Sequence, residues 1–199
     1  MKETRMAQKA GQPAQDHDGE EAVFPASVIR RLDEAEQWCR QHGQRLTKTR
    51  RQVLGLVLSE KQASGAYDLL ARLRTLQPRA VPPTVYRALE FLLEYGLVHR
   101  IERLSAFVGC HHALDCQSGC REHGTWGVHR AQFLICRQCR CVEELEQDVV
   151  AAVLLSSARG RGFQAEAATV EIEGLCAECA VSLSDGGTSH HGKDSDHDR

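Results

Sequence analysis

Apolar residues recur at helical spacing in four stretches of the first half of the chain, and each stretch predicts a short helix. The first covers residues 27–43 and stops at Gly43, the second starts from Thr47 as its N-cap, and the third follows Ser64. The fourth covers residues 82–96, where two prolines pre-set the first turn. The positions expected to be buried are Val28, Leu32, Ala35 and Cys39; Val53, Leu56 and Val57; Leu69, Leu70, Leu73 and Leu76; and Val85, Leu89, Leu92 and Leu93.

After Gly96 the pattern changes from a helical period to strand-like runs. Residues 97–103 and 106–110 predict a hairpin with a tight turn of the two residues between them. In that register His99 faces Cys110, and directly opposed residues have Cβ atoms about 4.5–5.5 Å apart. An imidazole and a thiolate at that spacing can share one metal ion.

The fourth helix carries a polar face opposite its buried stripe, with Thr84, Tyr86 and Arg87 in its N-terminal half. A helix in the DNA major groove reads bases with that half, where Arg contacts guanine or phosphate and Tyr meets a thymine methyl. Helices followed by a two-stranded wing describe a winged helix. The helix alone fits a solvated amphipathic helix equally well.

The second half predicts a helix over residues 143–160 and a strand over residues 165–174. The fold class expected is therefore α+β, with a winged-helix DNA-binding domain over residues 27–109 and a small α/β domain over residues 110–183. The terminal segments, residues 1–26 and 184–199, show no apolar period and are predicted to be disordered; the second contains His190, His191 and His197.

The net charge of −2 conceals an uneven distribution. Residues 27–105 hold 14 Lys and Arg against 8 Asp and Glu, whereas the remainder holds 11 against 19. A basic first domain favours a polyanionic partner. No apolar run approaches the ~20 residues of a membrane span, and no export signal is evident, so a cytoplasmic protein without membrane contact is expected. Its nine cysteines should then be metal ligands or catalytic thiols rather than disulfides.

Two C-x-x-C motifs supply four thiolates, enough to close a tetrahedral zinc site with no open position. They are Cys136 with Cys139, and Cys176 with Cys179. A redox C-x-x-C is the alternative, but it needs only one pair. Cys141, the third cysteine of "CRQCRC", has no place among the four and is expected to be a small buried residue.

Five blocks of the sequence resemble, in order, the ferric uptake regulator (Fur) family of metal-dependent repressors. They are "RLTKTRRQVLGLV", "AYDLLARL", "PPTVYRALEFLLEYGLVHRIE", "FLICRQCRCVEE" and "VEIEGLCAEC", and they span residues 45–179. The second and third look most like the zinc uptake regulator (Zur) branch. This resemblance implies that Tyr67 and Arg87 contact bases, with Thr84 and Tyr86 beside them. It also implies that the second domain mediates dimerisation and that the four cysteines form its structural zinc site.

The resemblance further implies a regulatory zinc site of His99, Cys110, His129 and Glu144. One thiolate, two imidazoles and a carboxylate favour zinc over iron. The expected function is a zinc-responsive transcriptional repressor that controls zinc uptake genes, with at least two zinc ions per chain. The expected partners are a second copy in a homodimer and double-stranded operator DNA of two-fold symmetry, with no small-molecule substrate.

Residues 111–128 form a Cys/His-rich insertion that is longer than the matching segment of the family. Four of its residues have the spacing and chemistry of a third zinc site, namely His112, Cys116, Cys120 and His123. Two alternatives stay open. The segment could be a flexible loop, or Cys116 or Cys120 could replace a regulatory ligand.

Three other functions stay open at this point. The chain could respond to iron, manganese or peroxide, or be a zinc or thiol enzyme, or be a protein-interaction module. An enzyme needs an open coordination position or an activated nucleophile, and no motif supplies either. A protein-interaction module would show no metal-dependent DNA binding.

Overall fold

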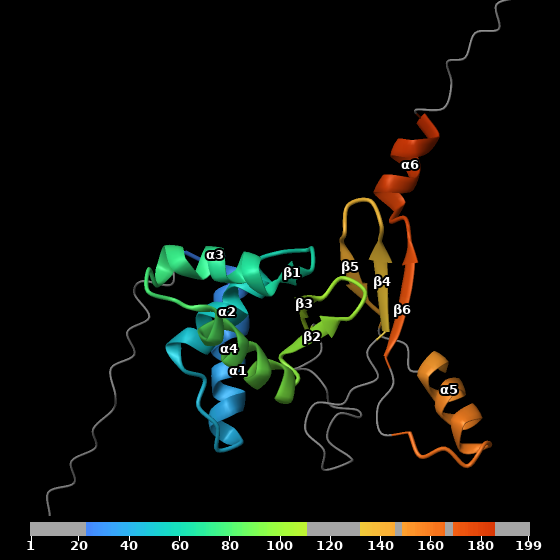
Figure 1. The fold of residues 1–199 in the computed structure, drawn as a ribbon, viewed down its shortest axis with the longest axis horizontal. Coiled ribbons are helices and arrows are strands. Elements are labelled where there is room, and N and C mark those ends of the chain that lie inside the picture. Colours follow the sequence, from blue (N-terminus) through green and yellow to red (C-terminus); the bar gives the residue numbers. More distant parts are fainter. Residues whose placement is uncertain (1–22, 111–131, 146–148, 166–168, 186–199) are drawn as a thin grey trace, which may run out of the picture.

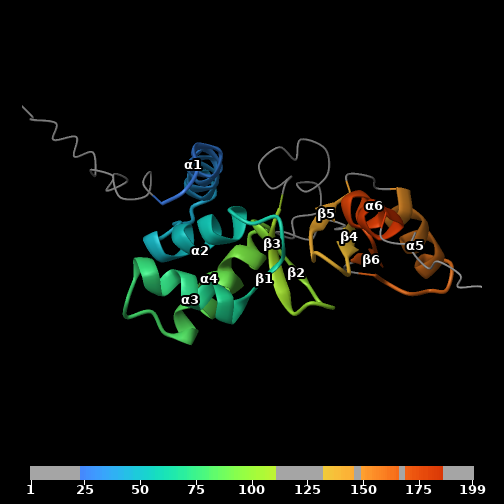
Figure 2. The same ribbon diagram turned by 90° about the horizontal axis from the view of Figure 1, so that it is seen from above.

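A computed structural model describes residues 23–110, 132–145, 149–165 and 169–185. In those ranges a helical unit with a small wing lies beside a three-stranded sheet that carries two further helices (Figures 1 and 2). The insertion over residues 111–128, with His112, Cys116, Cys120 and His123, falls outside the described residues. So do the regulatory candidate His129 and the C-terminal histidines.

The four predicted helices are confirmed as α1 Ala26–Gln41, α2 Lys48–Leu58, α3 Ala66–Leu76 and α4 Pro82–Glu94. Their first and last residues follow local chemistry. The Thr47 hydroxyl accepts a hydrogen bond from the Arg50 amide at 3.4 Å, and Pro82 opens α4, where its missing N–H costs nothing. Gly96 follows α4 with a φ of 63°, a conformation that favours glycine. All fifteen apolar positions expected to be buried lie in or against one core, Leu76 and Leu93 at its half-buried margin.

The N-terminal boundary of this core was predicted too late in the sequence. Ala26 opens α1, and Phe24 is only 5% exposed, although both fall in the segment expected to be disordered. A Cβ on Gly55 of α2 would lie 2.7 Å from Cζ of Phe24, so the absent side chain makes room for the ring. Phe24 is a single apolar residue without a period, which is why pattern reasoning passed over it.

The wing consists of β2 Val98–Ile101 and β3 Ala106–Gly109, with β1 Ser64–Gly65 on the other side of β3. Its predicted register is wrong: His99 pairs with Val108 rather than with Cys110. The turn takes the four residues 102–105, with Ser105 at a φ of 48°, so every partner shifts by two positions. A shift of two keeps each side chain on its face of the sheet, and His99 and Cys110 become diagonal neighbours.

The second unit is a sheet of order β5-β4-β6, formed by β4 Gln132–Cys136, β5 Val142–Glu144 and β6 Val170–Gly174. β4 pairs antiparallel with β5 and parallel with β6. The remaining elements are α5 Val149–Arg159 and α6 Ala177–Asp185. The helix predicted over residues 143–160 therefore starts later than expected, because Glu143 and Glu144 pair with β4.

A second, smaller core joins the two units. Ile101 of the wing is fully buried in a cluster with Phe133 and Ile135 of β4. The half-buried side chains around it come from both units and are Ala63, Leu104, Val108 and Val142. Backbone contacts add to this junction, since the Val142 amide donates to the Lys61 carbonyl at 3.3 Å. The wing is thus packed directly against the sheet.

Candidate metal centres and nucleic-acid interface

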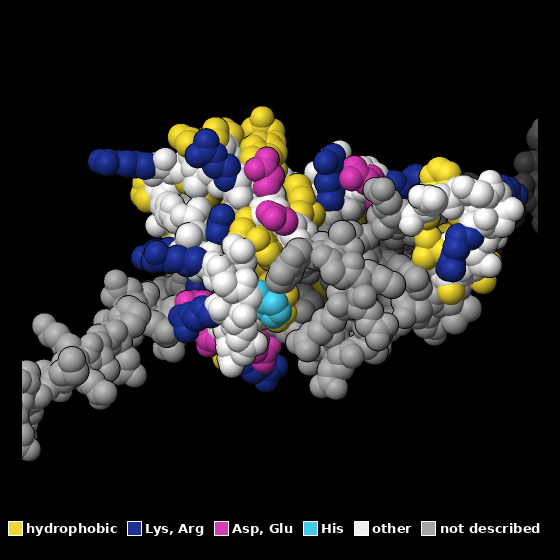
Figure 3. Space-filling model, turned by 90° about the horizontal axis from the view of Figure 1, so that it is seen from below, with side chains coloured by type: hydrophobic (Ala, Val, Ile, Leu, Met, Phe, Trp, Pro, Cys, Tyr) yellow, Lys and Arg dark blue, Asp and Glu magenta, His cyan; other side chains and the backbone are white. Residues whose placement is uncertain are grey.

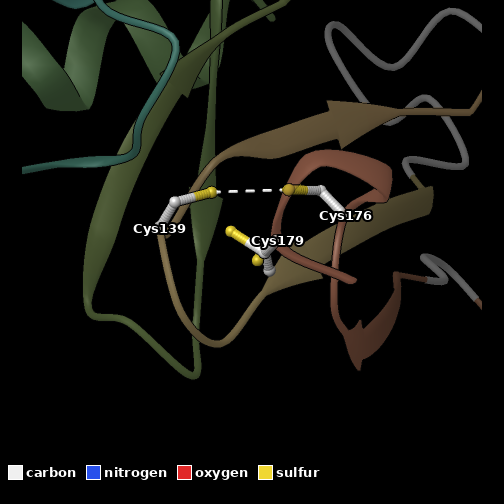
Figure 4. Close-up of side chains that lie close together, drawn as sticks. Cys139, Cys176 and Cys179 are labelled. Carbon is white, nitrogen blue, oxygen red and sulfur yellow. Dashed lines mark hydrogen bonds between the residues drawn. The ribbon is translucent and has the colours of Figure 1, made fainter. Parts of the chain in front are cut away.

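The four predicted cysteines come together at one end of the sheet. Cys136 ends β4 and pairs with Gly174, the last residue of the parallel strand β6, so both C-x-x-C motifs leave the sheet at the same end. The four sulfur atoms all lie within 4.8 Å of one another, and the Cys139 and Cys176 sulfurs are 3.7 Å apart (Figure 4). Zn–S bonds of about 2.3 Å in a tetrahedron put sulfurs about 3.8 Å apart, so the cluster fits zinc.

The cluster also favours thiolates. Backbone N–H groups of Cys139 and Cys176 donate to the Cys136 sulfur and lower its pKa to about 6. The Cys179 thiol hydrogen-bonds to the Cys176 sulfur, which with burial raises the pKa of Cys179 to about 12. The Cys136 thiolate is therefore strongly stabilised, whereas four thiolates at this spacing repel one another unless a cation lies among them.

Cys141 lies beside this cluster without belonging to its four ligands. Burial, followed by hydrogen bonds with the sulfurs of Cys139 and Cys176, raises the pKa of Cys141 to about 12. Its thiol is therefore a protonated donor toward Cys139. The residue is half-buried rather than fully buried, and it forms an isolated β-bridge with Gln62 of the helical unit.

Three of the four predicted regulatory ligands also converge. Donor atoms of His99, Cys110 and Glu144 all lie within 4.8 Å of one another. Nε2 of His99 is 3.3 Å from Oε1 of Glu144, and the two side chains are 10% and 7% exposed. Zn–N and Zn–O bonds of about 2.0–2.2 Å in a tetrahedron separate N and O by about 3.4 Å, so this donor set fits zinc as well.

Several neighbours hold these ligands in place. The ring of Phe133 meets the His99 ring edge-on, with centroids 5.3 Å apart. The Cys110 amide donates to the Leu97 carbonyl at 3.1 Å, and Nη2 of Arg31 on α1 donates to the Cys110 carbonyl at 2.7 Å. Burial lowers the pKa of Arg31, while Cys110 and Glu144 act in the opposite direction, so the guanidinium lies within electrostatic reach of both ligands. Arg31 is distant in sequence and belongs to no motif, and sequence reasoning missed it.

The residues expected at DNA lie on the outside of the helical unit. Tyr67, in the first turn of α3, is 72% exposed, and Tyr86 on α4 is 43% exposed. Arg87 is exposed as well, and Thr84 is half-buried. Their arrangement is that of a helix-turn-helix, with α4 packed on α2 and α3 through its opposite, apolar face. Lys and Arg side chains stand out from the helical unit in the view from below (Figure 3).

Among the described residues, more large apolar side chains are exposed in the second unit than in the first. On α5, Val150, Val153 and Leu154 are exposed, and the loop after it carries Phe163, which is 65% exposed. The sheet and α6 add Leu134, Ile172 and Val181. In both views α5 stands off the sheet instead of covering it (Figures 1 and 2). Exposed apolar groups on this scale are typical of a surface that another protein covers.

Known proteins are similar to this chain in sequence and in fold. The model of the ferric uptake regulator family matches residues 41–173. The zinc uptake regulation protein of Escherichia coli (strain K12) is 40% identical over 148 residues, which is 74% of this chain and 80% of that protein. A solved zinc uptake regulator complexed with zinc and DNA is 37% identical, with a TM-score of 0.72 over 80% of this chain and 99% of that one. Holo XcZur is 39% identical, with a TM-score of 0.65 over 76% and 98%.

No helix of the described ranges has the length and apolar character that a membrane span requires.

Proposed function

The chain belongs to the ferric uptake regulator family, and on that premise we propose that it is a zinc-responsive transcriptional repressor. It binds operator DNA as a homodimer when its regulatory site holds zinc, and it controls genes for zinc uptake. The observation that carries this proposal is the approach of His99, from the wing, to Glu144, from the sheet, at 3.3 Å. A ligand set shared between the DNA-binding unit and its neighbour makes metal binding sensitive to the angle between them.

Zinc is the metal that the donors favour. The regulatory set combines the Cys110 thiolate with an imidazole and a carboxylate, and we assign its fourth position to His129. The second zinc ion belongs to the four cysteines, where it has a structural role and no open position. The relatives named for zinc uptake support the same metal. We assign no catalytic role to either site.

The exposed apolar side chains of the second unit, on α5 above all, support a dimer. A second copy with the same surface would cover these side chains across a two-fold axis. Two α4 helices must then reach half-sites about 34–36 Å apart on one face of the DNA, with Arg87 and Tyr67 as base contacts. Such an operator has two-fold symmetry, and a repressor of this kind acts in the cytoplasm.

The regulatory ligands control DNA binding by selecting one angle between the units. His99 and Cys110 move with the wing and Glu144 moves with the sheet, so all three reach one ion in only a narrow range of angles. Zinc at this site supplies a tether between the units. Its preference for the fitting angle sets the gain in DNA affinity, about 5- to 150-fold for a typical coupling. DNA must tighten zinc binding by the same factor.

The test is a DNA-binding titration at fixed salt with a fragment from upstream of zinc-transporter genes, because salt alone changes such affinities steeply. Protein stripped of exchangeable metal is compared in buffered zinc, iron(II) and manganese(II). Tightening by zinc alone supports the proposal. Tightening by iron or manganese alone assigns the chain to another sensor of the family, and binding that no metal changes overturns regulation by this site.

The assignment of ligands is tested separately with serine variants of Cys110 and Cys116. We expect Cys110→Ser to remove zinc-dependent DNA binding, whereas Cys116→Ser leaves it intact. The reverse result would move the regulatory thiolate into the insertion. Counting bound zinc in both variants also tests whether the insertion holds a third zinc ion.

A further inference from the structure

The turn of the wing is held by a carboxylate of the sheet. Glu171 of β6 accepts a hydrogen bond from the Glu102 amide at 2.7 Å with one oxygen, and from the Arg103 amide at 3.3 Å with the other. Beside it, the Arg103 guanidinium donates to Glu173 of β6 at 3.1 and 3.2 Å. We call these four residues the wing clasp. Amides at two consecutive positions form a small anion-binding concavity, and here the anion comes from the other unit.

The wing clasp and the regulatory site contact the wing from opposite edges of the sheet. Glu144 lies on β5 and Glu171 on β6, with β4 between them. Ile101 packs on Phe133 of β4 in the middle. A single attachment leaves the wing free to rotate about it, whereas a second at the other edge removes that rotation. The clasp uses no regulatory ligand, so it acts with or without zinc.

We propose that Glu171 is a positioning residue that holds the two units at the angle required for DNA binding, assisted by the ion pair of Arg103 with Glu173. This inference rests on the proposed function. The angle is taken to be the DNA-competent one because this chain superposes on a zinc uptake regulator complexed with zinc and DNA at a TM-score of 0.72, over 80% of this chain and 99% of that one. A clasp that held the units in a different arrangement would be incompatible with that agreement across both units.

The clasp and zinc then favour the same conformation, which has a measurable consequence. Without the clasp, part of the free energy of zinc binding is spent on bringing the units together, so zinc binds less tightly although no ligand has changed. Losing hydrogen bonds to a charged acceptor at a partly exposed site should lower the population of the clasped state about five- to tenfold. Saturating zinc compensates for most of that loss in DNA binding.

The experiment compares Glu171→Ala, which loses both acceptor oxygens, with Glu171→Gln, which keeps one. Glu143→Gln is the matched control, because Glu143 is an exposed carboxylate of the same sheet that forms no ion pair within the described residues. Three quantities are measured on the full chain. They are hydrogen exchange at the amides of residues 102 and 103, zinc affinity of the regulatory site by chelator competition without DNA, and DNA affinity at limiting and saturating zinc.

For Glu171→Ala we expect faster exchange at both amides, zinc affinity about five- to tenfold weaker, and DNA binding weakened most at limiting zinc. Glu171→Gln should lie between it and the wild type, and Glu143→Gln should match the wild type. Should Glu171→Ala fail to fold, Arg103→Glu replaces it, with Glu173→Arg added to restore the pair. If the wild type responds to zinc but the clasp variant binds zinc and DNA as tightly as the wild type or more tightly, the role of the clasp is overturned and the proposed function stands. A wild type that ignores zinc overturns the proposed function instead.

Discussion

Nε2 of His99 and Oε1 of Glu144 lie 3.3 Å apart across the junction of the two units, with both side chains almost completely enclosed. His99 is carried by a wing strand and Glu144 by the edge strand β5, so this distance depends on how the wing is packed against the sheet. A buried carboxylate beside an imidazole is costly unless a proton or a cation is shared between them. The pair therefore belongs to the proposed regulatory zinc site, and its spacing depends on the angle between the units.

Glu144→Gln tests this pair most directly, because it keeps the shape of the side chain and removes its charge. We expect the regulatory zinc to be lost and DNA binding in zinc to fall to the metal-free level, a loss of about 5- to 150-fold. The structural zinc and the helix content should be retained. Binding curves and zinc counts are compared with those of Glu143→Gln, a neighbouring carboxylate outside the site. A Glu144→Gln protein that still responds to zinc would exclude the carboxylate from the site.

The role of the four cysteines is tested by Cys176→Ser. One zinc ion fewer per chain is expected, together with loss of order in the second unit, since a structural zinc site contributes its binding free energy to folding. Circular dichroism and metal analysis report the two effects. Cys141→Ser is the matched control, because that thiol touches Cys139 and Cys176 without being one of the four ligands. It should bind the wild-type amount of zinc.

Much of this arrangement follows from local sequence. The helices were predicted because apolar spacing and the end signals at Thr47, Pro82 and Gly96 are contained within each element. The cysteine cluster followed from two short motifs. The register of the wing was wrong because a turn of two residues and one of four leave the same alternation of side chains in the flanking strands.

Contacts between residues far apart in the chain could not be predicted in this way. Glu171 reaches the wing turn because β6 pairs in parallel with β4, and Arg31 reaches the Cys110 carbonyl from α1. Neither lies in a motif, and each is an ordinary charged residue in its own element. The sequence offered no signal for them, because charge on an exposed strand or helix is equally typical of a solvated surface.

At the proposed DNA interface, Arg87→Ala should weaken binding to the operator by about 1–3 kcal/mol and relax the preference for it over unrelated DNA. Arg87 is exposed in the N-terminal half of α4, where a recognition helix contacts bases. Arg30→Ala on α1 removes the same charge from another exposed surface and controls for general electrostatics. If Arg87→Ala instead weakens binding to operator and to unrelated DNA equally, as is expected of Arg30→Ala, Arg87 contacts phosphate rather than a base.

Cys39 gives a prediction about pH. Burial raises the pKa of this thiol from 9.0 to about 11, with Arg50 acting in the opposite direction. The folded state thus holds the proton more tightly than the unfolded state. The protonated thiol therefore contributes about 2–3 kcal/mol to the free energy of unfolding. This contribution is fully present below pH 9 and is lost as the pH rises through 11. Denaturant unfolding across this range should show a steeper loss for the wild type than for Cys39→Ala, and parallel curves would contradict the assignment.

Gly109 ends the last wing strand, one residue before the proposed ligand Cys110, and α2 passes close against it. We call Gly109 and Cys110, where the chain leaves the wing, the hinge. A Cβ at this position would overlap Cδ2 of Leu58, so Gly109→Ala must displace either that side chain or the hinge. Because Cδ2 is the far end of a half-buried side chain that can turn away, we expect a cost at the low end of the about 1–3 kcal/mol typical of overpacking, measured as the free energy of unfolding by denaturant titration. Gly160→Ala, where the nearest atoms are at ordinary contact distances of 3.6 and 3.7 Å, is the control.

Because Cys110 follows Gly109, we expect the same displacement in Gly109→Ala to weaken zinc-dependent DNA binding as well. Leu58→Ala combined with Gly109→Ala removes the overlap, so if the clash is the whole effect the double variant regains zinc-dependent DNA binding. It would not regain it if the hinge needs the conformational freedom of glycine, because the alanine Cβ remains. A φ outside the left-handed region in this conformation favours the first result, since alanine adopts such a backbone without strain. The close contact with Leu58 would then be the reason for a glycine next to Cys110, the proposed regulatory thiolate.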